Sequence, residues 1–253
     1  DTNYTNQKLT KLSGSDAITD ARTGGDEYPQ GLTLIDIGQG NNTGYPLRYG
    51  FVKNEKHSDF RFVQYFYGTG NESGSYIDST GTWIRHWWSG SGWTAWHKIS
   101  GFAHANIGTT GIQYLDKKAH TKIQFNRKRK DSHNAFDTKN SRFVAPNDGM
   151  FLVGVGLYMI NTPAYINFHL KLYLNGSLYK PIDHLRGDFN DKESEMNLDL
   201  NGTVTVPMNK GDYIEIYCYC NYSGDDRRGV SDYNEAYNYI DIQELGGLNY
   251  PTV

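Results

Sequence analysis

The sequence has little cysteine, no marked excess of charge of either sign and no long hydrophobic run. No segment approaches the ~18 consecutive apolar residues of a membrane-spanning helix, and no secretory leader is visible. Lys and Arg together number 25 and Asp and Glu 28, so the net charge is only −3. This near balance argues against duplex nucleic acid or an anionic membrane as the main partner. We therefore expect neither nucleic-acid binding nor membrane insertion.

The two cysteines, Cys218 and Cys220, lie two residues apart in an expected strand. Strand residues at this spacing share one face, with Cα atoms ~6.6 Å apart, at the far edge of disulfide geometry. We interpret both as small buried thiols, and a disulfide or redox pair is the alternative. Because there is no disulfide framework, the redox compartment stays open.

Glycine and tyrosine are abundant, with 28 and 20 residues, and 14% of the chain is aromatic. Aromatic and β-branched runs are separated by clusters of Gly, Asn and Ser, which is typical of antiparallel sheets. The expected strands of the first half are 32–37, 61–67, 81–88 and 93–99. In the second half, residues 166–174 and 213–220 alternate with a period of two, and no long amphipathic helix follows Gly111. The predicted fold class is all-β.

The pattern changes at two points along the chain. Residues 1–25 are polar with weak periodicity, and we expect a connector from a missing upstream shaft, since the chain begins at Asp1 rather than Met. The β signal then continues to residue 100, where the sequence relaxes. We therefore predict a small β module at 26–100 and a second domain at 101–253. A removed leader stays open.

Tyrosine gathers on one face of the expected strand 213–220. Ile and Cys occupy one face of this strand, whereas Tyr217 and Tyr219 lie on the other. Because tyrosine is unusual on a freely solvated face, we predict that both lie at a subunit interface, with Phe151 as a further candidate. The alternative is that tyrosine covers ordinary surface.

The second half resembles the globular head shared by the complement first component and the tumour-necrosis-factor superfamily. Four motifs appear in the family's order, at Phe136–Phe151, Leu172–Gly176, Val204–Ile216 and Tyr239–Leu245. Asn175-Gly176, within the second motif, suits a two-residue type I′ hairpin. The resemblance implies a jelly-roll sandwich that assembles into a homotrimer. The collagen-like stalk and paired cysteines of the secreted members are absent from this sequence.

The first half resembles a pyocin-knob module, a small β domain of phage tail fibres and related bacteriocins. Its closing signature, an aromatic strand, a Gly/Ser turn and a Gly-Trp-x-x-Trp motif, matches Thr82–Ile99, and Arg61–Phe66 matches its Gln-bearing strand. Such a knob before a trimeric head resembles the tip of a tail fibre or baseplate fibre of a phage that infects Gram-positive bacteria. The resemblance implies an extracellular virion protein that contacts other fibre or baseplate proteins and adheres to a host cell-wall polysaccharide or teichoic acid.

Several clusters are candidates for binding the glycan. All five tryptophans fall within fourteen positions. Three of them lie on both faces of the expected strand 82–88, so one aromatic face needs a neighbour or serves as a sugar platform. Packing in a core or interface is the alternative for these rings. Basic and acidic loop residues supply further candidates, although charge runs usually face water. The candidate glycan-binding residues are Trp83, Trp87, Trp88, Trp93, Arg127, Arg129, Asp188, Asp191, Arg227 and Arg228.

The sequence contains no P-loop, nucleophile elbow, zinc-protease motif or EF-hand loop. Its eight histidines show no metal-ligand spacing. We therefore expect no enzyme, no metal and no cofactor. Two alternatives stay open: Ca²⁺ held by the acidic stretches 183–199 or 224–226, and a glycan depolymerase that uses carboxylates of the first stretch. A third alternative is a structural cap that drives trimerisation without touching the receptor.

Overall fold

The computed structural model describes residues 9–13, 16–38, 44–69, 80–162, 166–186, 196–222, 228–231, 236–246 and 248–249. The chain divides into two units, one of Asp1–Phe102 with Gly246–Val253 and the other of Ala103–Leu245. Strands dominate both, and the helical element assigned within the described ranges is the short 3-10 helix η2 (Gly25–Glu27). The all-β prediction is confirmed. In these same ranges no helix is long and apolar enough to cross a membrane.

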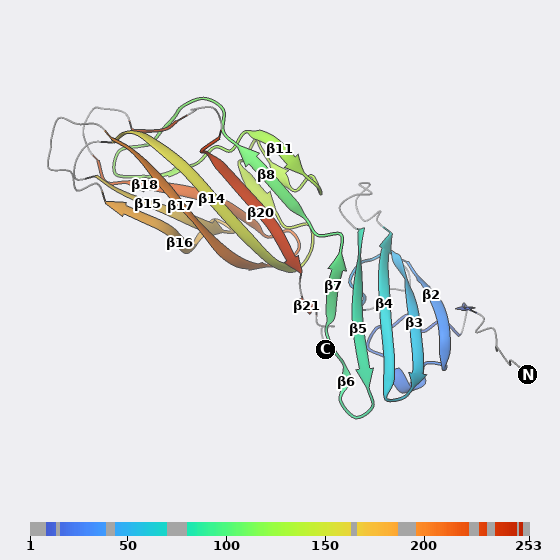
Figure 1. Ribbon diagram of the computed structural model, residues 1–253. Coiled ribbons are helices and arrows are strands. Elements are labelled where there is room, and N and C mark those ends of the chain that lie inside the picture. The colour runs from blue at the N-terminus through green and yellow to red at the C-terminus, as the bar shows by residue number, and fades with distance from the viewer. Residues whose placement is uncertain are drawn as a thin grey trace, which may run out of the picture. The chain divides into compact units, whose positions relative to one another are not determined.

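The first unit is built on one sheet whose strands follow one another almost in chain order. The order is β1-β2-β3-β4-β5-β7-β21, with β6 paired to the end of β5 (Figure 1). β1 joins β2 in parallel, and the other pairs are antiparallel. The strands are β1 (Thr10–Leu12), β2 (Gly31–Ile37), β3 (Gly50–Ser58), β4 (Arg61–Thr69), β5 (Thr80–Trp88), β6 (Gly92–Trp93), β7 (Trp96–Ser100) and β21 (Leu248–Asn249).

The two-residue period of these strands gives the sheet one covered face. There Phe66 lies edge-to-face with both Trp83 and Trp96, and Tyr45 stacks on the same phenyl ring. The covering segment is the chain before β2 and between β2 and β3, which supplies Tyr28, Tyr45 and other apolar side chains to this core. The opposite face carries the alternate residues of each strand.

The segment before residue 25 belongs to this unit rather than to a connector. Thr10–Leu12 form β1 beside β2, and Ala21 is buried in the core. Leu12 and Ile18 pack against the same core. These apolar residues are too few to show a period in the sequence, yet their burial holds the segment in place. The predicted connector at 1–25 is therefore corrected from Thr10 onward.

A row of polar side chains crosses the covered face. Asn54 donates from Nδ2 to Thr33 Oγ1 at 3.0 Å, and Gln64 donates from Nε2 to Asn54 Oδ1 at 2.7 Å. Arg85 completes the row by donating from Nε to Gln64 Oε1 at 2.7 Å. The four residues are direct cross-strand partners on β2, β3, β4 and β5, and all are buried. A one-residue slip of any strand would break the row, so it fixes the register of the sheet.

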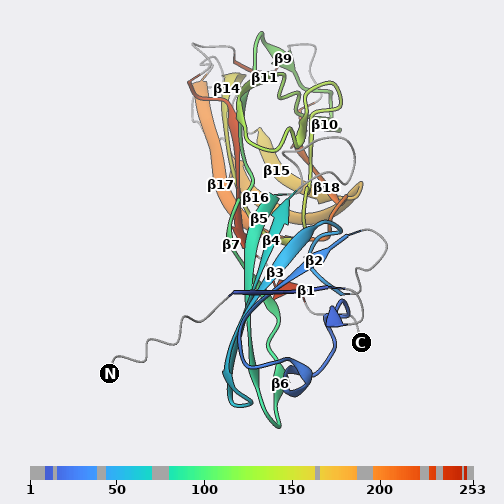
Figure 2. The same cartoon turned by 90° about the vertical axis from the view of Figure 1, so that its right-hand side faces the viewer.

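In the second unit, two sheets pack face to face. One runs β12-β13-β18-β15-β16 with β10 beside β18, and the other runs β11-β8-β20-β14-β19-β9 with β17 beside β14. Figure 2 shows β14 and β17 on one side of this unit and β15 and β18 on the other. After β14, the β15–β16 hairpin, β17, β18 and β20 alternate between the sheets, which is jelly-roll connectivity. The predicted sandwich is confirmed.

The strands of this unit, in chain order, are β8 (His104–Gly108), β9 (Gln113–Tyr114), β10 (His120–Lys122), β11 (Arg127–Asp131), β12 (Phe136–Asp137), β13 (Arg142–Val144), β14 (Gly149–Thr162), β15 (Asn167–Leu174), β16 (Ser177–Arg186), β17 (Met196–Met208), β18 (Tyr213–Cys220), β19 (Gly229–Val230) and β20 (Tyr239–Gly246). Their inward side chains form one core, in which Phe143 lies edge-to-face with Phe151 at 5.5 Å between ring centroids. Cys218 and Cys220 are free and buried, as predicted, and this burial raises the pKa of both thiols.

The last strand departs from the expected division of the chain. Leu248–Asn249 form β21, which pairs with β7 of the first unit. These residues fall within the predicted second domain, which comprises everything after residue 100. Two residues are too short a segment to show a period, so the sequence pattern carried no sign of their partner strand.

Candidate functional site

The hairpin of β5 and β6 brings three tryptophans to one end of the first sheet. Trp87 and Trp88 are neighbours on β5 and therefore point to opposite faces of the sheet. Trp93 of β6 pairs directly with Trp87, and their ring centroids lie 5.2 Å apart. Gly25 makes room for the Trp87 ring, because a Cβ atom there would lie 2.3 Å from it.

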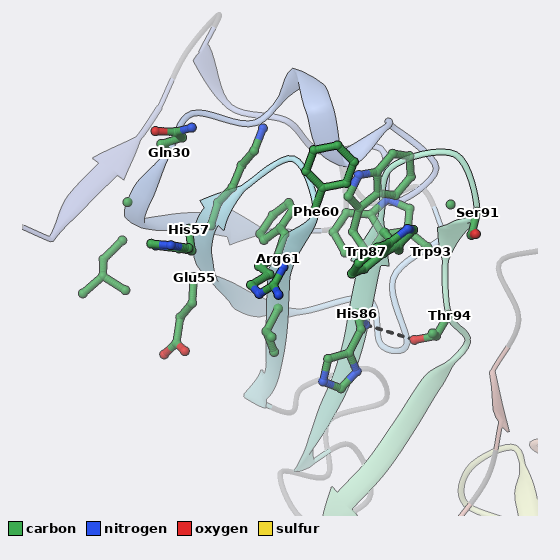
Figure 3. A pocket seen from close by; sticks show the side chains of 17 residues that line it. Gln30, Glu55, His57, Phe60, Arg61, His86, Trp87, Ser91, Trp93 and Thr94 are labelled. Carbon is green, nitrogen blue, oxygen red and sulfur yellow. Dashed lines mark hydrogen bonds between the residues drawn. The ribbon is translucent and has the colours of Figure 1, made fainter.

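A groove of about 1040 Å³ opens at this end of the sheet (Figure 3). At its rim, Phe60 from the β3–β4 turn lies 5.8 Å from Trp88, centroid to centroid, in an edge-to-face arrangement. Each of these two side chains is 52% exposed. Trp87 and Trp93 line the same groove. A solvated wall of indole and phenyl rings is the surface on which the apolar faces of a sugar stack.

Polar side chains also line the groove. Gln30, His57, Arg61, His86 and Thr94 line it, and Figure 3 shows them around the aromatic rings. Within the described ranges, Arg61 has no carboxylate partner. Its guanidinium therefore remains available to an anionic group of a ligand.

The other charged residues of the groove are already engaged. Lys56 donates from Nζ to the carbonyl oxygens of Asp26 and Tyr28 at 3.0 and 2.7 Å, and it pairs with Asp59 at 2.8 Å. Glu55 pairs with Lys53 at 2.6 Å. Among the described residues, the groove thus combines aromatic rings with one cation that has no carboxylate partner.

Arg85 lies directly behind the groove. Its guanidinium carbon is 3.9 Å from the ring centroid of Trp93 and 4.4 Å from that of Trp96. Burial lowers the pKa of Arg85 to about 10, so the side chain stays charged at neutral pH. Its two terminal nitrogens have no hydrogen-bond partner among the described residues. The cation–π contacts therefore hold Trp93 against the core.

The structure corrects two of the predicted glycan-binding residues. Trp83 is 1% exposed and packs at the centre of the first core, so it offers no ring to a sugar. Arg228 is 3% exposed and lies 4.3 Å over the ring of Tyr222. Both side chains pack against other side chains inside the fold. The local sequence is the same whether such a side chain packs internally or binds a ligand, so it did not show which applies.

The remaining candidates are separated from the groove. Arg127 and Arg129 lie exposed on β11, an edge strand of the second unit. Charged residues on an edge strand also prevent strand pairing with another molecule. Their position on this strand is therefore no evidence that they bind a ligand. Asp188, Asp191 and Arg227 lie outside the described residues, as does the acidic stretch 224–226. Of the predicted set, the groove brings together Trp87, Trp88 and Trp93.

The residues predicted at a subunit interface have two different environments. Phe151 has no exposed surface, because it faces the sandwich core, so the prediction for it is corrected. Tyr217 and Tyr219 lie on the outward face of β18 and are half-buried. Rings of the same chain cover part of them: Tyr173 lies 4.4 Å from Tyr217, and His120 lies 5.0 Å from Tyr219. That a partner subunit covers the rest stays a prediction.

Sequence reasoning missed Phe60 and Arg61. Phe60 stands in a tight turn between two strands, where an aromatic side chain has no core to enter. An aromatic residue at a turn was therefore the sequence feature that could have indicated an exposed ring. Its closeness to Trp88 depends on the pairing of β3, β4 and β5, which a local pattern does not show. In the described ranges, no group of three or more His, Cys, Asp or Glu residues is placed to hold a metal ion.

Two curated proteins of Bacillus subtilis (strain 168) are similar to this chain. The uncharacterized protein YqcC is 70% identical over 253 residues, which cover 99% of this chain and 69% of YqcC. The phage-like element PBSX protein XkdV is 58% identical over 255 residues, which cover 100% of this chain and 37% of XkdV. The chain thus spans about two thirds of one relative and little more than a third of the other.

Among solved structures, the Eiger tumour necrosis factor of S. frugiperda aligns with 60% of this chain and 96% of its own, at 14% identity and a TM-score of 0.42. The globular domain of zebrafish complement 1qA aligns with 59% and 98%, at 17% identity and a TM-score of 0.36. Residues 10–98 match the family described as phage-like element PBSX protein XkdV 3rd domain. The resemblance of residues 26–100 to a pyocin knob stays a prediction. The identity with YqcC along nearly the whole chain shows that this protein belongs to the YqcC family.

Proposed function

We propose that the chain is a non-enzymatic part of a phage-like particle, at the tip of a tail fibre or in the baseplate, and adheres to a host cell-wall glycopolymer. The relationship to XkdV, a protein of the phage-like element PBSX, supports a place in such a particle. The groove of the first unit supports adhesion. Phe60 and Trp88 present exposed rings to a sugar, and Arg61, which has no carboxylate partner among the described residues, lines the same groove.

The single observation that carries this proposal is the exposed Phe60–Trp88 pair. Apolar side chains exposed singly are common, whereas adjacent exposed rings form a continuous apolar patch, which marks a binding site. A teichoic acid joins sugars or polyols through phosphates, so it would use the rings and Arg61 together. Several such sites on one particle would add avidity.

Removing the two rings is expected to abolish most of the adhesion. For the Phe60→Ala/Trp88→Ala variant we expect affinity for purified Gram-positive cell walls to fall at least about tenfold, because each ring loses its stacking contact. Pull-down of the purified chain with wall fragments measures this. Leu178→Ala, which trims an equally exposed side chain of the second unit, is the matched control and should bind as the wild type does.

Three results would contradict the proposal. Unchanged wall binding by the double variant would exclude the groove as the site. Absence of any binding by the wild-type chain, in its native assembly, would favour the structural cap instead. Release of reducing ends from the walls would show a depolymerase.

We also propose that three chains assemble. The jelly-roll strand order of the second unit supports this assembly, because the sequence resemblance of this half implies a homotrimer. Light scattering of the purified chain should then give a mass three times the 28.7 kDa of one chain. A stable monomer at micromolar concentration would contradict this assembly, but it would leave the groove and its test unaffected.

A further inference from the structure

The outward face of β10, β18, β15 and β16 carries a continuous row of aromatic side chains. His120 pairs across the strands with Tyr219, Tyr219 with His169, and His169 with His184. Successive ring centroids lie 5.0, 5.5 and 4.0 Å apart. Three of the four rings are imidazoles. We call these four residues the histidine row.

Positive charge surrounds the histidine row. Lys171 lies beside it, with its ammonium 5.9 Å from the Tyr219 ring, and in the described ranges it has no carboxylate partner. Arg186 ends β16 at the next position on this face. Lys122 pairs across the strands with Tyr217, in the neighbouring row.

The carboxylates of the same four strands are neutralised or turned away. Glu215 pairs with Lys122 at 2.5 Å and accepts a hydrogen bond from the Tyr217 hydroxyl at 3.3 Å. Asp183 accepts hydrogen bonds from the backbone amides of His184 and of Asn201 on β17. No other acidic residue lies in β10, β15, β16 or β18. Among the described residues of these four strands, basic residues therefore outnumber acidic ones even with neutral imidazoles.

We propose that the histidine row and Lys171 form a second binding site, separate from the groove, for a phosphate-bearing polymer. Imidazolium and ammonium groups spaced along one row can each meet a phosphate of an extended chain, while the stacked rings fix their positions. The negative phosphates of such a polymer complement the positive charge of Lys171 and of the protonated imidazoles. A partner protein would need to bury the Lys171 ammonium, which costs free energy unless an anion meets it.

Binding at this site strengthens as the pH falls. Burial, together with His184, Lys171 and His120, lowers the pKa of His169, and burial and Lys171 lower that of His120. The free protein therefore holds these two imidazoles neutral near pH 7. A bound polyanion favours their charged form, so binding takes up protons, and it is tighter below the ordinary histidine pKa than above it.

The test is calorimetric titration of the purified chain with inorganic polyphosphate at low salt, at about pH 5.5 and about pH 7.5. We expect at least about tenfold tighter binding at the lower pH. His169→Gln/His184→Gln should reduce this difference, since His120 alone of the three imidazoles remains, and Lys171→Gln should weaken binding at both pH values. His104→Gln, an exposed histidine of the other sheet, is the matched control. Should the double variant misfold, His184→Gln alone, on an exposed edge strand, replaces it with a smaller expected loss.

Three outcomes would overturn the proposal. The first is equal binding by wild type and the histidine variants. The second is tighter binding of an oligothymidine than of polyphosphate, which would indicate base stacking and nucleic-acid recognition. The third is a changed assembly mass in the histidine variants, which would make the row an interface between copies. Phe60→Ala/Trp88→Ala should retain polyphosphate binding, so failure of the groove and failure of this site are distinguishable.

Discussion

Arg85→Ala is expected to destabilise the first unit by about 3–5 kcal/mol. The side chain is fully buried, bonds to Gln64 and fills the space between Trp93 and Trp96. Alanine leaves a cavity between the two indole rings and strips Gln64 of its donor. All five tryptophans lie in the first unit. Urea unfolding followed by tryptophan fluorescence therefore measures the loss in this unit alone.

Arg85→Met is the matched variant for this experiment. It keeps most of the volume and removes the charge, whose burial is unfavourable, as the lowered pKa of Arg85 shows. The remaining loss of stability, about 1–3 kcal/mol, comes from Gln64 Oε1, which stays buried without its hydrogen-bond donor. We therefore expect methionine to be less destabilising than alanine. An equal loss in both variants would show that the charge itself, rather than the packing, holds the tryptophans.

Phe151→Ala is expected to destabilise the second unit by about 3–5 kcal/mol, since it removes a fully buried ring from the sandwich core. The edge-to-face contact with Phe143 is lost with it. Because the described strands of this unit contain no tryptophan, its unfolding is followed by tyrosine fluorescence or circular dichroism. The tryptophan transition of the first unit should not move.

Met150→Ala supplies the comparison for the second unit. Met150 is the neighbour of Phe151 on β14 but is exposed, so its truncation should cost less than about 0.5 kcal/mol. The result that would contradict the core assignment is a Phe151→Ala protein of unchanged stability whose assembly mass falls. That outcome would restore the interface predicted for this residue from the sequence.

Much of the fold could be predicted because strand period and turn chemistry are local properties. Asn175 and Gly176 have φ angles of 51° and 78°, and they join β15 to β16 in the predicted two-residue hairpin. The alternation in Ile214–Cys220 likewise placed both cysteines in the core. Each of these features depends only on residues of one strand or of one hairpin, which are close in the sequence.

The candidate site could be predicted only in part, because a period tells which residues share a face but not which face is covered. Trp83 and Trp87 share a face of β5, yet one is at the centre of the core and the other lines the groove at the end of the sheet. Arg85 between them is buried, against the usual placement of arginine, because a polar row across four strands satisfies its Nε. Such partners lie on other strands and leave no local pattern.

After the sandwich the chain returns to its first sheet, where β21 pairs with β7. This connectivity determines which part of the protein can be exchanged as a unit. β8 and β20 are antiparallel neighbours, with His104 opposite Gln243, so the chain leaves the first unit and re-enters it at adjacent points. The sandwich is therefore an inserted domain whose first and last strands are neighbours. An inserted domain with adjacent ends can be exchanged for another without disturbing the sheet into which it is inserted. Such an exchange would replace the whole sandwich and leave the groove of the first sheet unchanged.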